Sequence, residues 1–211
     1  MTDIIPAVLP HSLDQLAESL ARLKGVAPLA QVDVVSDIFG DEEGLPEWEE
    51  FDFEFDLYVE PATFVARAVE LGASAVVVHA RHHSATQALE ALQEYRTGSF
   101  AIKVGVALRP TDDTSVLERF SGLYDYVQVM GIDNEGRQGE PFNPRTVELV
   151  AALRQTNPDL FIQVDGHAAG HEQALAQAGA NRLVEGSAIL AADNPKVALK
   201  EAYTRANNGS H

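Results

Sequence analysis

The chain has 211 residues, 45% of them hydrophobic and 22% charged, with a formal net charge of −17 and no cysteine. The charge argues against binding to nucleic acid or to an anionic membrane, because both partners need a basic face. The missing cysteines exclude disulfides and thiolate catalysis and favour a cytoplasmic protein, and no apolar run reaches the length that crosses a membrane.

Short β-like runs recur along the chain and are nearly continuous in apolar residues. Such runs are typical of parallel strands that are buried on both faces. The expected strands cover residues 4–9, 29–35, 51–59, 74–80, 101–108, 124–130, 160–165 and 182–185.

Helical patterns separate nearly all of these runs. Leucines at helical spacing follow Ser12, a candidate N-cap, and a second amphipathic pattern ends at Gly72. Repeated alternation of strand and helix predicts the α/β class and a single (β/α)₈ barrel of the TIM type over residues 1–206. Residues 207–211 are interpreted as a disordered or appended tail.

One segment, residues 37–50, departs from this regularity. It is strongly acidic, contains Gly and Pro, and has room for one helical turn around residues 46–50. We interpret it as a solvated loop, with a lid that carries Phe39 or Trp48 over the barrel mouth as the alternative.

Two of the last apolar runs end at a glycine, Gly166 and Gly186. In a (β/α)₈ barrel, the loops after strands 7 and 8 and the start of a short helix offer backbone N–H groups to phosphate. We therefore predict a phosphate site at Gly166, Gly186 and Ser187, with Gly136 or Gly139 closing its side. The negative field of the chain repels anions, so backbone dipoles or a cation must hold the phosphate.

Two aspartates lie in expected strands whose ends meet at the barrel mouth, Asp33 and Asp165. Carboxylates placed there are able to remove a proton beside a carbonyl and return it on the opposite face of the carbon. The alternative for Asp33 is that it caps a turn or pairs with a buried cation.

The ordered set of strand segments resembles the ribulose-phosphate 3-epimerase family nearly end to end. The segments are residues 5–9, 31–35, 53–59, 103–110, 127–130, 164–166 and 186–189. The resemblance implies a ribulose-phosphate-binding barrel that epimerises or isomerises a small phosphorylated sugar. It also implies that Met130 lines the pocket, and that Asp33 and Asp165 match the two aspartates that hold the family's metal.

The departures from the family concern its metal and phosphate sites. The two histidines that complete the family's metal site are replaced by Gln31 and Asp56, a serine on the first strand by Ala7, and a glycine after the seventh strand by His167. The set Gln31, Asp33, Asp56 and Asp165 offers only oxygen, which does not suit zinc. We expect at most a labile Mg²⁺ or Mn²⁺, and no organic cofactor.

Other outcomes for these carboxylates stay open. In one alternative, one carboxyl is protonated, since like charges raise one another's pKa. In the other, a basic side chain pairs with the carboxylates, and the candidates are Lys103, Arg109, Arg137 and His167. Among the remaining histidines, His79 is interpreted as a satisfied core or rim residue, and His82 and His83 as solvated residues of a loop on the mouth side.

Three functions follow as hypotheses. The first is a divergent sugar-phosphate epimerase or isomerase that works through Asp33 and Asp165. The second is a lyase related to sugar-phosphate decarboxylases, although residues 56–60 lack the lysine that this group places on its third strand. The third is an inactive barrel that binds a phosphorylated ligand or a protein. The sequence leaves the sugar and the oligomeric state open, with a homo-oligomer as one option.

Overall fold

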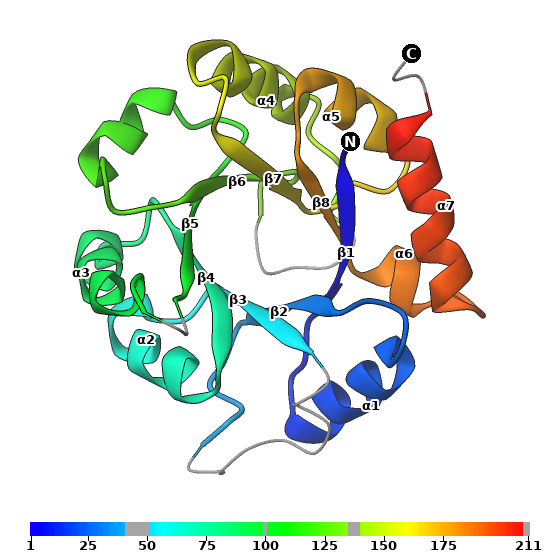
Figure 1. Cartoon of the computed structure of the whole chain (residues 1–211), viewed down its shortest axis with the longest axis horizontal. Helices are drawn as coiled ribbons and strands as arrows, with labels where there is room; N and C mark the ends of the chain where they lie inside the picture. Colours follow the sequence, from blue (N-terminus) through cyan, green and yellow to red (C-terminus); the bar gives the residue numbers. More distant parts are fainter. Residues whose placement is uncertain (41–50, 99–100, 135–139, 209–211) are drawn as a thin grey trace.

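The computed structural model describes residues 1–40, 51–98, 101–134 and 140–208. Eight parallel strands form a closed barrel in chain order, and helices surround it (Figure 1). This confirms the predicted fold class. The strands are β1 Asp3–Val8, β2 Leu29–Val34, β3 Asp52–Leu57, β4 Ala73–His79, β5 Lys103–Leu108, β6 Tyr126–Met130, β7 Phe161–Asp165 and β8 Arg182–Glu185.

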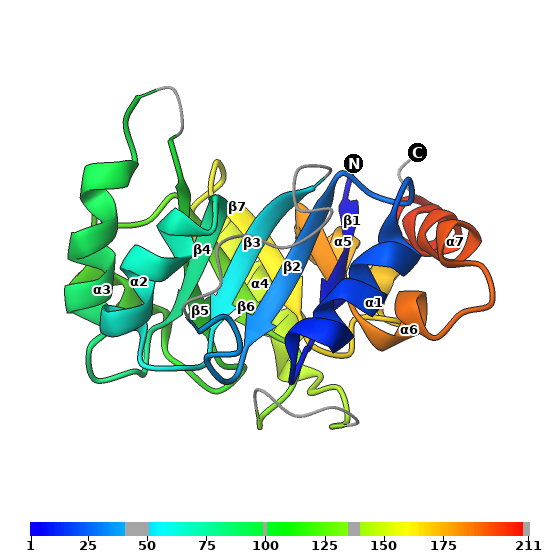
Figure 2. The same cartoon turned by 90° about the horizontal axis from the view of Figure 1, so that it is seen from below.

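Among the described residues a helix follows every strand except β2, and the one that follows β5 is a 3₁₀ helix. In side view, α1 and α6 lie next to each other on the outside of the barrel (Figure 2). The helices are α1 Leu13–Leu23, α2 Pro61–Glu70, α3 Ala85–Ala91, α4 Arg145–Thr156, α5 Glu172–Ala178, α6 Ser187–Leu190 and α7 Pro195–Asn207, with the 3₁₀ helices η2 Leu92–Tyr95 and η3 Thr114–Phe120.

Local signals account for several helix boundaries. The Ser12 side chain accepts a hydrogen bond of 3.2 Å from the N–H of Gln15, as expected of an N-cap. Gly179 ends α5 with a φ of 112°, a left-handed conformation that glycine adopts without strain. The second helix ends one residue earlier than its pattern suggested, because Leu71 is its C-cap and Gly72 follows it.

The segment after β2 is described only as far as Gly40, so Trp48 and the expected turn at 46–50 lie outside the described residues. Phe39 is 1% exposed, and its ring meets that of Phe55 edge-on at 5.9 Å. The ring therefore belongs to the core beneath α2, and the alternative of a lid that carries Phe39 over the mouth is wrong.

Side-chain alternation along the strands separates an apolar layer from a polar barrel interior. On β3, Phe53 and Phe55 pack in the hydrophobic core with residues of the surrounding helices, so Glu54 and Asp56 point into the barrel. At Gly105 on β5, an added Cβ would lie 2.6 Å from the ring of Tyr126. Glycine there makes room for this ring inside the barrel.

The two ends of the described chain meet at the base of the barrel. The N–H of Thr2 donates to Asn207 Oδ1 at 2.9 Å, and Asn207 Nδ2 donates to the carbonyl of Thr2 at 2.9 Å. Helix α7 thus extends to Asn207, the first residue of the predicted tail, and residues 209–211 lie outside the described residues. None of the helices in the described ranges is long and apolar enough to span a membrane.

Candidate active site

The mouth of the barrel, where the strands end, holds a cavity of about 690 Å³. Seven predicted site residues line it together: Asp33, Met130, Asp165, Gly166, His167, Gly186 and Ser187. The cavity also takes in Ala7, Tyr58, Glu140 and Glu185. Gly136 and Gly139 lie outside the described residues.

Three aspartates meet at the floor of this cavity. One carboxylate oxygen each of Asp33, Asp56 and Asp165 lies within 4.8 Å of the others. The Gln31 amide lies between two of them and donates to Asp33 Oδ1 at 2.8 Å and to Asp165 Oδ2 at 3.0 Å. The amide oxygen instead accepts a hydrogen bond of 3.3 Å from Gln163 Nε2. In this structure Gln31 thus offers the cluster its amide donor, and its oxygen faces Gln163.

Asp56 has its own pair of donors. His79 Nε2 lies 2.9 Å from one of its oxygens, and Gln128 Nε2 donates to the other at 2.7 Å. The Tyr58 ring packs on the His79 imidazole with a centroid separation of 4.6 Å. His79 is 9% exposed and hydrogen-bonded to Asp56, as expected of a satisfied core or rim histidine. This contact also makes His79 part of the site.

A buried polar layer supports the aspartates from below. Gln163 Nε2 donates to Glu54 Oε1 at 2.5 Å and to Gln128 Oε1 at 2.7 Å. The Tyr126 hydroxyl donates to Glu54 Oε2 at 2.6 Å, and Arg182 Nη1 lies 3.8 Å from that oxygen. A continuous hydrogen-bonded network thus extends from the barrel interior to the mouth.

Sequence analysis assigned no role to this layer, although the sequence carries a signal for it. Gln163 precedes Asp165 by two positions, and Glu54 precedes Asp56 by two. Residues two apart on a strand share a face, so a second polar residue at this spacing in an apolar strand also points into the barrel.

The electrostatics of the cluster keep a proton in the site near neutral pH. Burial, and then repulsion by Asp165 and Asp56, raise the pKa of Asp33 well above its ordinary value. Burial, and then repulsion by Asp56, raise the pKa of Asp165 to about 7. The hydrogen bond from Gln31 opposes both changes. Near pH 7 the two carboxyls therefore combine one acid and one base.

Tyr58 adds a neutral donor to the cavity. Burial and the negative charges of the aspartates raise the pKa of its phenol well above the ordinary value. The hydroxyl therefore keeps its proton across the working pH range, and it interacts with the Asp56 carboxylate, from which it would have to turn to donate to an oxygen atom of a bound ligand.

The loop after β7 has a left-handed backbone at two successive residues, Gly166 with a φ of 102° and His167 with a φ of 53°. Left-handed geometry at a non-glycine residue costs about 1–3 kcal/mol and clusters at functional sites. His167 thus keeps the backbone conformation for which glycine is suited, although it stands where the resembled family has glycine. An added Cβ at Gly131 would lie 1.8 Å from the carbonyl of Gly166, so the loops after β6 and β7 touch.

The loop after β8 starts a short helix on the same side of the cavity. Gly186 is the N-cap of α6, and the N–H groups at Ser187 and Ala188 have no acceptor within the helix. Both residues line the cavity with Gly166. The predicted phosphate-binding groups are therefore close together.

Glu185, next to this helix start, was missed by the sequence analysis. It is 3% exposed, and neither carboxylate oxygen has a hydrogen-bond partner among the described residues. Burial, and then repulsion by Glu172, raise its pKa to about 7, which Arg205 partly offsets. The sequence feature that points to Glu185 is an acidic residue at the end of an otherwise apolar strand.

Few of the proposed bases reach the cavity. Lys103 begins β5 and so lies at the opposite end of the barrel, Arg109 is not among the lining residues, and Arg137 lies outside the described residues. Of the described lining residues, only His167 is able to carry a positive charge.

The three aspartates offer only oxygen, a donor set that fits a hard cation and does not fit zinc.

Comparisons with known proteins show which family and which fold the chain shares. Residues 41–190 match the model of the "Ribulose-phosphate 3 epimerase family". The ribulose-phosphate 3-epimerase of Schizosaccharomyces pombe is 33% identical over 141 residues, which are 66% of this chain and 60% of that protein. The Synechocystis enzyme of the same name is 30% identical over 143 residues, 65% of this chain and 61% of that protein. The matches thus span about 60% of these relatives' length.

Solved structures share the whole fold at low sequence identity. The 3-hexulose-6-phosphate synthase of Salmonella typhimurium has a TM-score of 0.72 at 14% identity, covering 97% of this chain and 98% of that one. The orotidine 5'-monophosphate decarboxylase of Sulfolobus solfataricus has a TM-score of 0.65 at 14% identity, covering 98% of both chains. At this identity the likeness shows the barrel fold alone.

Proposed function

The chain belongs to the ribulose-phosphate 3-epimerase family, and we propose that it is a divergent sugar-phosphate epimerase or isomerase. The observation that carries this proposal is the pair of aspartates at the mouth, half-buried Asp33 and buried Asp165, one able to act as acid while the other acts as base. Proton transfer beside a carbonyl needs such a pair with its pKa values near the working pH.

The two aspartates have different parts in the proposed reaction. Asp165, with a pKa of about 7, takes the proton from the carbon beside the carbonyl. Asp33, whose pKa burial and repulsion by its neighbours raise well above the ordinary value, returns a proton on the opposite face. The neutral phenol of Tyr58 donates a hydrogen bond to a developing enediolate oxygen. In the reverse direction the two aspartates exchange roles.

The phosphate of the substrate binds on the β7–β8 side of the cavity. We propose that the N–H groups of Gly166, Gly186 and Ser187 hold it, because glycine allows close approach of the backbone and the start of α6 carries a partial positive charge. His167 lines the same part of the cavity and supplies a positive charge when it is protonated.

We also propose that Asp33, Asp56 and Asp165 hold a labile Mg²⁺ or Mn²⁺. When bound, such a cation would polarise the substrate carbonyl and stabilise negative charge on the enediolate oxygens. Without the two histidines of the family's metal site, we expect turnover of ribulose 5-phosphate to be slow.

Hydrogen exchange in D₂O tests this function with pentulose and hexulose phosphates as substrates. Deuterium enters at the carbon beside the carbonyl even where net epimerisation is too slow to follow. Asp33→Asn and Asp165→Asn should each lower the exchange rate by about 10²–10⁴-fold with little change in KM. Asp14→Asn, which alters an exposed aspartate of α1, is the matched control and should exchange like wild type.

A second candidate function is a barrel that binds a phosphorylated ligand without turnover. It is favoured by the fact that Gln31, His79 and Gln128 already satisfy the three aspartates. If no tested sugar phosphate exchanges deuterium, and both Asn variants bind these sugar phosphates as well as wild type does, the protein is a binding barrel and the proposed epimerase function is wrong. The lyase has less support, because no lysine lies among the described residues that line the cavity.

A further inference from the structure

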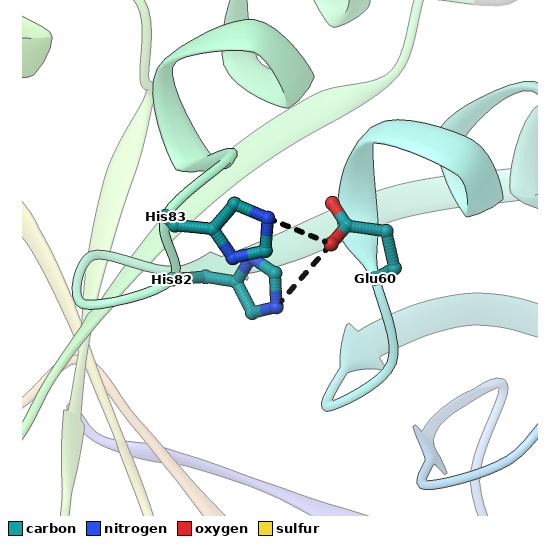
Figure 3. Close-up of side chains that lie close together, drawn as sticks. All are labelled: Glu60, His82 and His83. Carbon is teal, nitrogen blue, oxygen red and sulfur yellow. Dashed lines mark ion pairs between the residues drawn. The ribbon is translucent and has the colours of Figure 1, made fainter.

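A second group of chemically reactive side chains lies at the rim of the barrel mouth (Figure 3). Glu60 stands between β3 and α2, and His82 and His83 stand between β4 and α3. His83 Nε2 lies 3.3 Å from Glu60 Oε2, and His82 Nε2 lies 3.8 Å from the same oxygen. One potential ligand atom from each residue lies within 4.8 Å of the other two.

We propose that Glu60, His82 and His83 form a binding site for a divalent transition-metal ion such as Zn²⁺. In a tetrahedral site with zinc–ligand distances of about 2.0–2.1 Å, neighbouring ligand atoms are about 3.4 Å apart. The contact between His83 and Glu60 already has this separation, and His82 needs only a small movement to reach it. Two imidazoles and one carboxylate leave a fourth position open to water or to another ligand.

Ser84 supplies the supporting contacts that such a site needs. Its hydroxyl lies 3.1 Å from His82 Nδ1 and donates a short hydrogen bond to Glu60 Oε1. A histidine that binds a metal through Nε2 carries its proton on Nδ1 and passes it to an oxygen acceptor. With Nδ1 protonated, the Ser84 hydroxyl is able to accept a hydrogen bond from it while it orients the carboxylate, and the long 3.4 Å contact from the Ser84 N–H to Nδ1 is given up. Ser84 is only 9% exposed.

Backbone hydrogen bonds define the loop that carries the two histidines and the turn that carries Glu60. The N–H of His82 donates to the carbonyl of His79 at 3.0 Å, and the N–H of Ala85 donates to the carbonyl of His82 at 3.1 Å. These bonds close a tight turn around the two histidines. Glu60 caps α2 by accepting from the N–H of Ala62 at 3.4 Å.

The electrostatics also favour a cation at this rim. The Glu60 carboxylate accepts from the Ser84 hydroxyl on one oxygen and faces both imidazoles with the other, so one oxygen is oriented toward the ion. The net charge of −17 attracts cations to the surface. The His83 side chain is 81% exposed, which leaves the ligands open to an arriving ion.

The ligand chemistry distinguishes this rim site from the three aspartates in the cavity. Imidazole nitrogen selects Zn²⁺, Ni²⁺ and Cu²⁺, whereas carboxylates alone suit Mg²⁺ and Mn²⁺. The expectation of no tight zinc binding concerns the four positions at the strand ends, where Gln31 and Asp56 stand in place of histidines and the nearby His79 bonds Asp56. At the rim, two imidazoles meet a carboxylate instead, and this proposal does not depend on the proposed activity.

Calorimetric titration of the full chain with ZnCl₂ near pH 7.5 tests the site. We expect one zinc ion per chain to bind with an affinity that excess Mg²⁺ leaves unchanged. The double variant His82→Gln/His83→Gln should lose this binding, and Ser84→Ala should weaken it roughly 10- to 100-fold. His11→Gln, which removes an exposed histidine elsewhere, is the matched control and should bind zinc like wild type.

Anomalous scattering at the zinc edge then locates the ion in crystals of the wild type. A peak bound by Glu60, His82 and His83 supports the proposal. A peak at Asp33, Asp56 and Asp165 alone, or an unchanged zinc affinity in the double variant, would overturn it. Both histidines lie on the surface loop, and circular dichroism verifies that the double variant is folded.

Discussion

The side-chain amide of Gln31 donates a hydrogen bond of 3.0 Å to Oδ2 of Asp165, joining β2 to β7 inside the barrel. The same amide bonds Asp33 at 2.8 Å. A neutral donor thus lies between two carboxylates that repel each other, and it favours their ionised forms.

Replacing this donor should move the pH dependence of catalysis. Gln31→Met removes a hydrogen bond that lowers the pKa of Asp165, so the pKa rises above about 7. The base must be ionised, so the rising limb of kcat/KM should shift to higher pH. A hydrogen bond to a charged group is worth about 1.5–3 kcal/mol, which corresponds to about 1–2 pH units.

The measurement is the rate of deuterium exchange between pH 5 and pH 9. Gln173→Met, at an exposed glutamine of α5, is the control and should keep the wild-type profile. A Gln31→Met profile that overlays the wild type would rule out Asp165 as the base whose ionisation limits the rate.

The phosphate site is tested by soaking crystals with inorganic phosphate. We expect the anion beside the N–H groups of Gly166, Gly186 and Ser187, where two loops and the start of α6 meet. Ser187→Asp adds a carboxylate in the cavity and should weaken phosphate binding by more than about tenfold. Ser121→Asp adds the same charge before β6, at the other end of the barrel, and should have little effect. Phosphate bound elsewhere, with this position empty, would refute the assignment.

Restoring nitrogen ligands should create a zinc site at the strand ends. Gln31→His and Asp56→His together place imidazoles beside Asp33 and Asp165, a ligand set that suits zinc. The experiment uses the His82→Gln/His83→Gln background, so that the rim site does not contribute. We expect the added pair to raise zinc affinity in calorimetry. An unchanged affinity would mean that positions 31 and 56 do not correspond to metal-ligand positions.

Glu185 should make the fold less stable as the pH rises. Its pKa in the folded state is about 7, above the ordinary value near 4.3, so the folded protein binds more protons than the unfolded chain between these values. Stability is therefore lost as the pH rises toward 7. The advantage of Glu185→Gln over wild type should grow by about 2–3 kcal/mol between pH 5 and pH 8.

Urea denaturation at the two pH values measures this difference. Glu118→Gln, at an exposed glutamate, should show no comparable change with pH. If the free energy of unfolding of Glu185→Gln differs from that of wild type by the same amount at both pH values, Glu185 ionises in the folded protein as freely as in the unfolded chain.

The barrel itself was predictable because its signals are local and repeated. The run at 182–185 matches β8 at both ends, and the runs at 29–35 and 160–165 differ from β2 and β7 by one residue at one end. Buried parallel strands are marked by apolar continuity, and their ends by glycine or polar residues. The cavity positions of Asp33 and Asp165 follow from the same rule.

What the sequence did not predict depends on contacts between distant segments. Nothing local shows that Gln31 turns its amide nitrogen toward Asp165, since that orientation is set by Gln163 on β7. His82 was interpreted as solvated because its partner Glu60 belongs to another loop. The apolar position of Phe39 was ambiguous between lid and core until its contacts with Phe55 and Phe64 were known.

The polar layer inside the barrel constrains how this chain is able to change in evolution. Gln163 donates to both Glu54 and Gln128, so replacing Gln163 by an apolar residue leaves one buried oxygen on each without this donor, at about 1–3 kcal/mol each. Single steps toward an apolar interior are therefore selected against, whereas a coordinated exchange is tolerated. Among close relatives we expect these three positions to vary together, and Gly105 to be retained wherever Tyr126 is present.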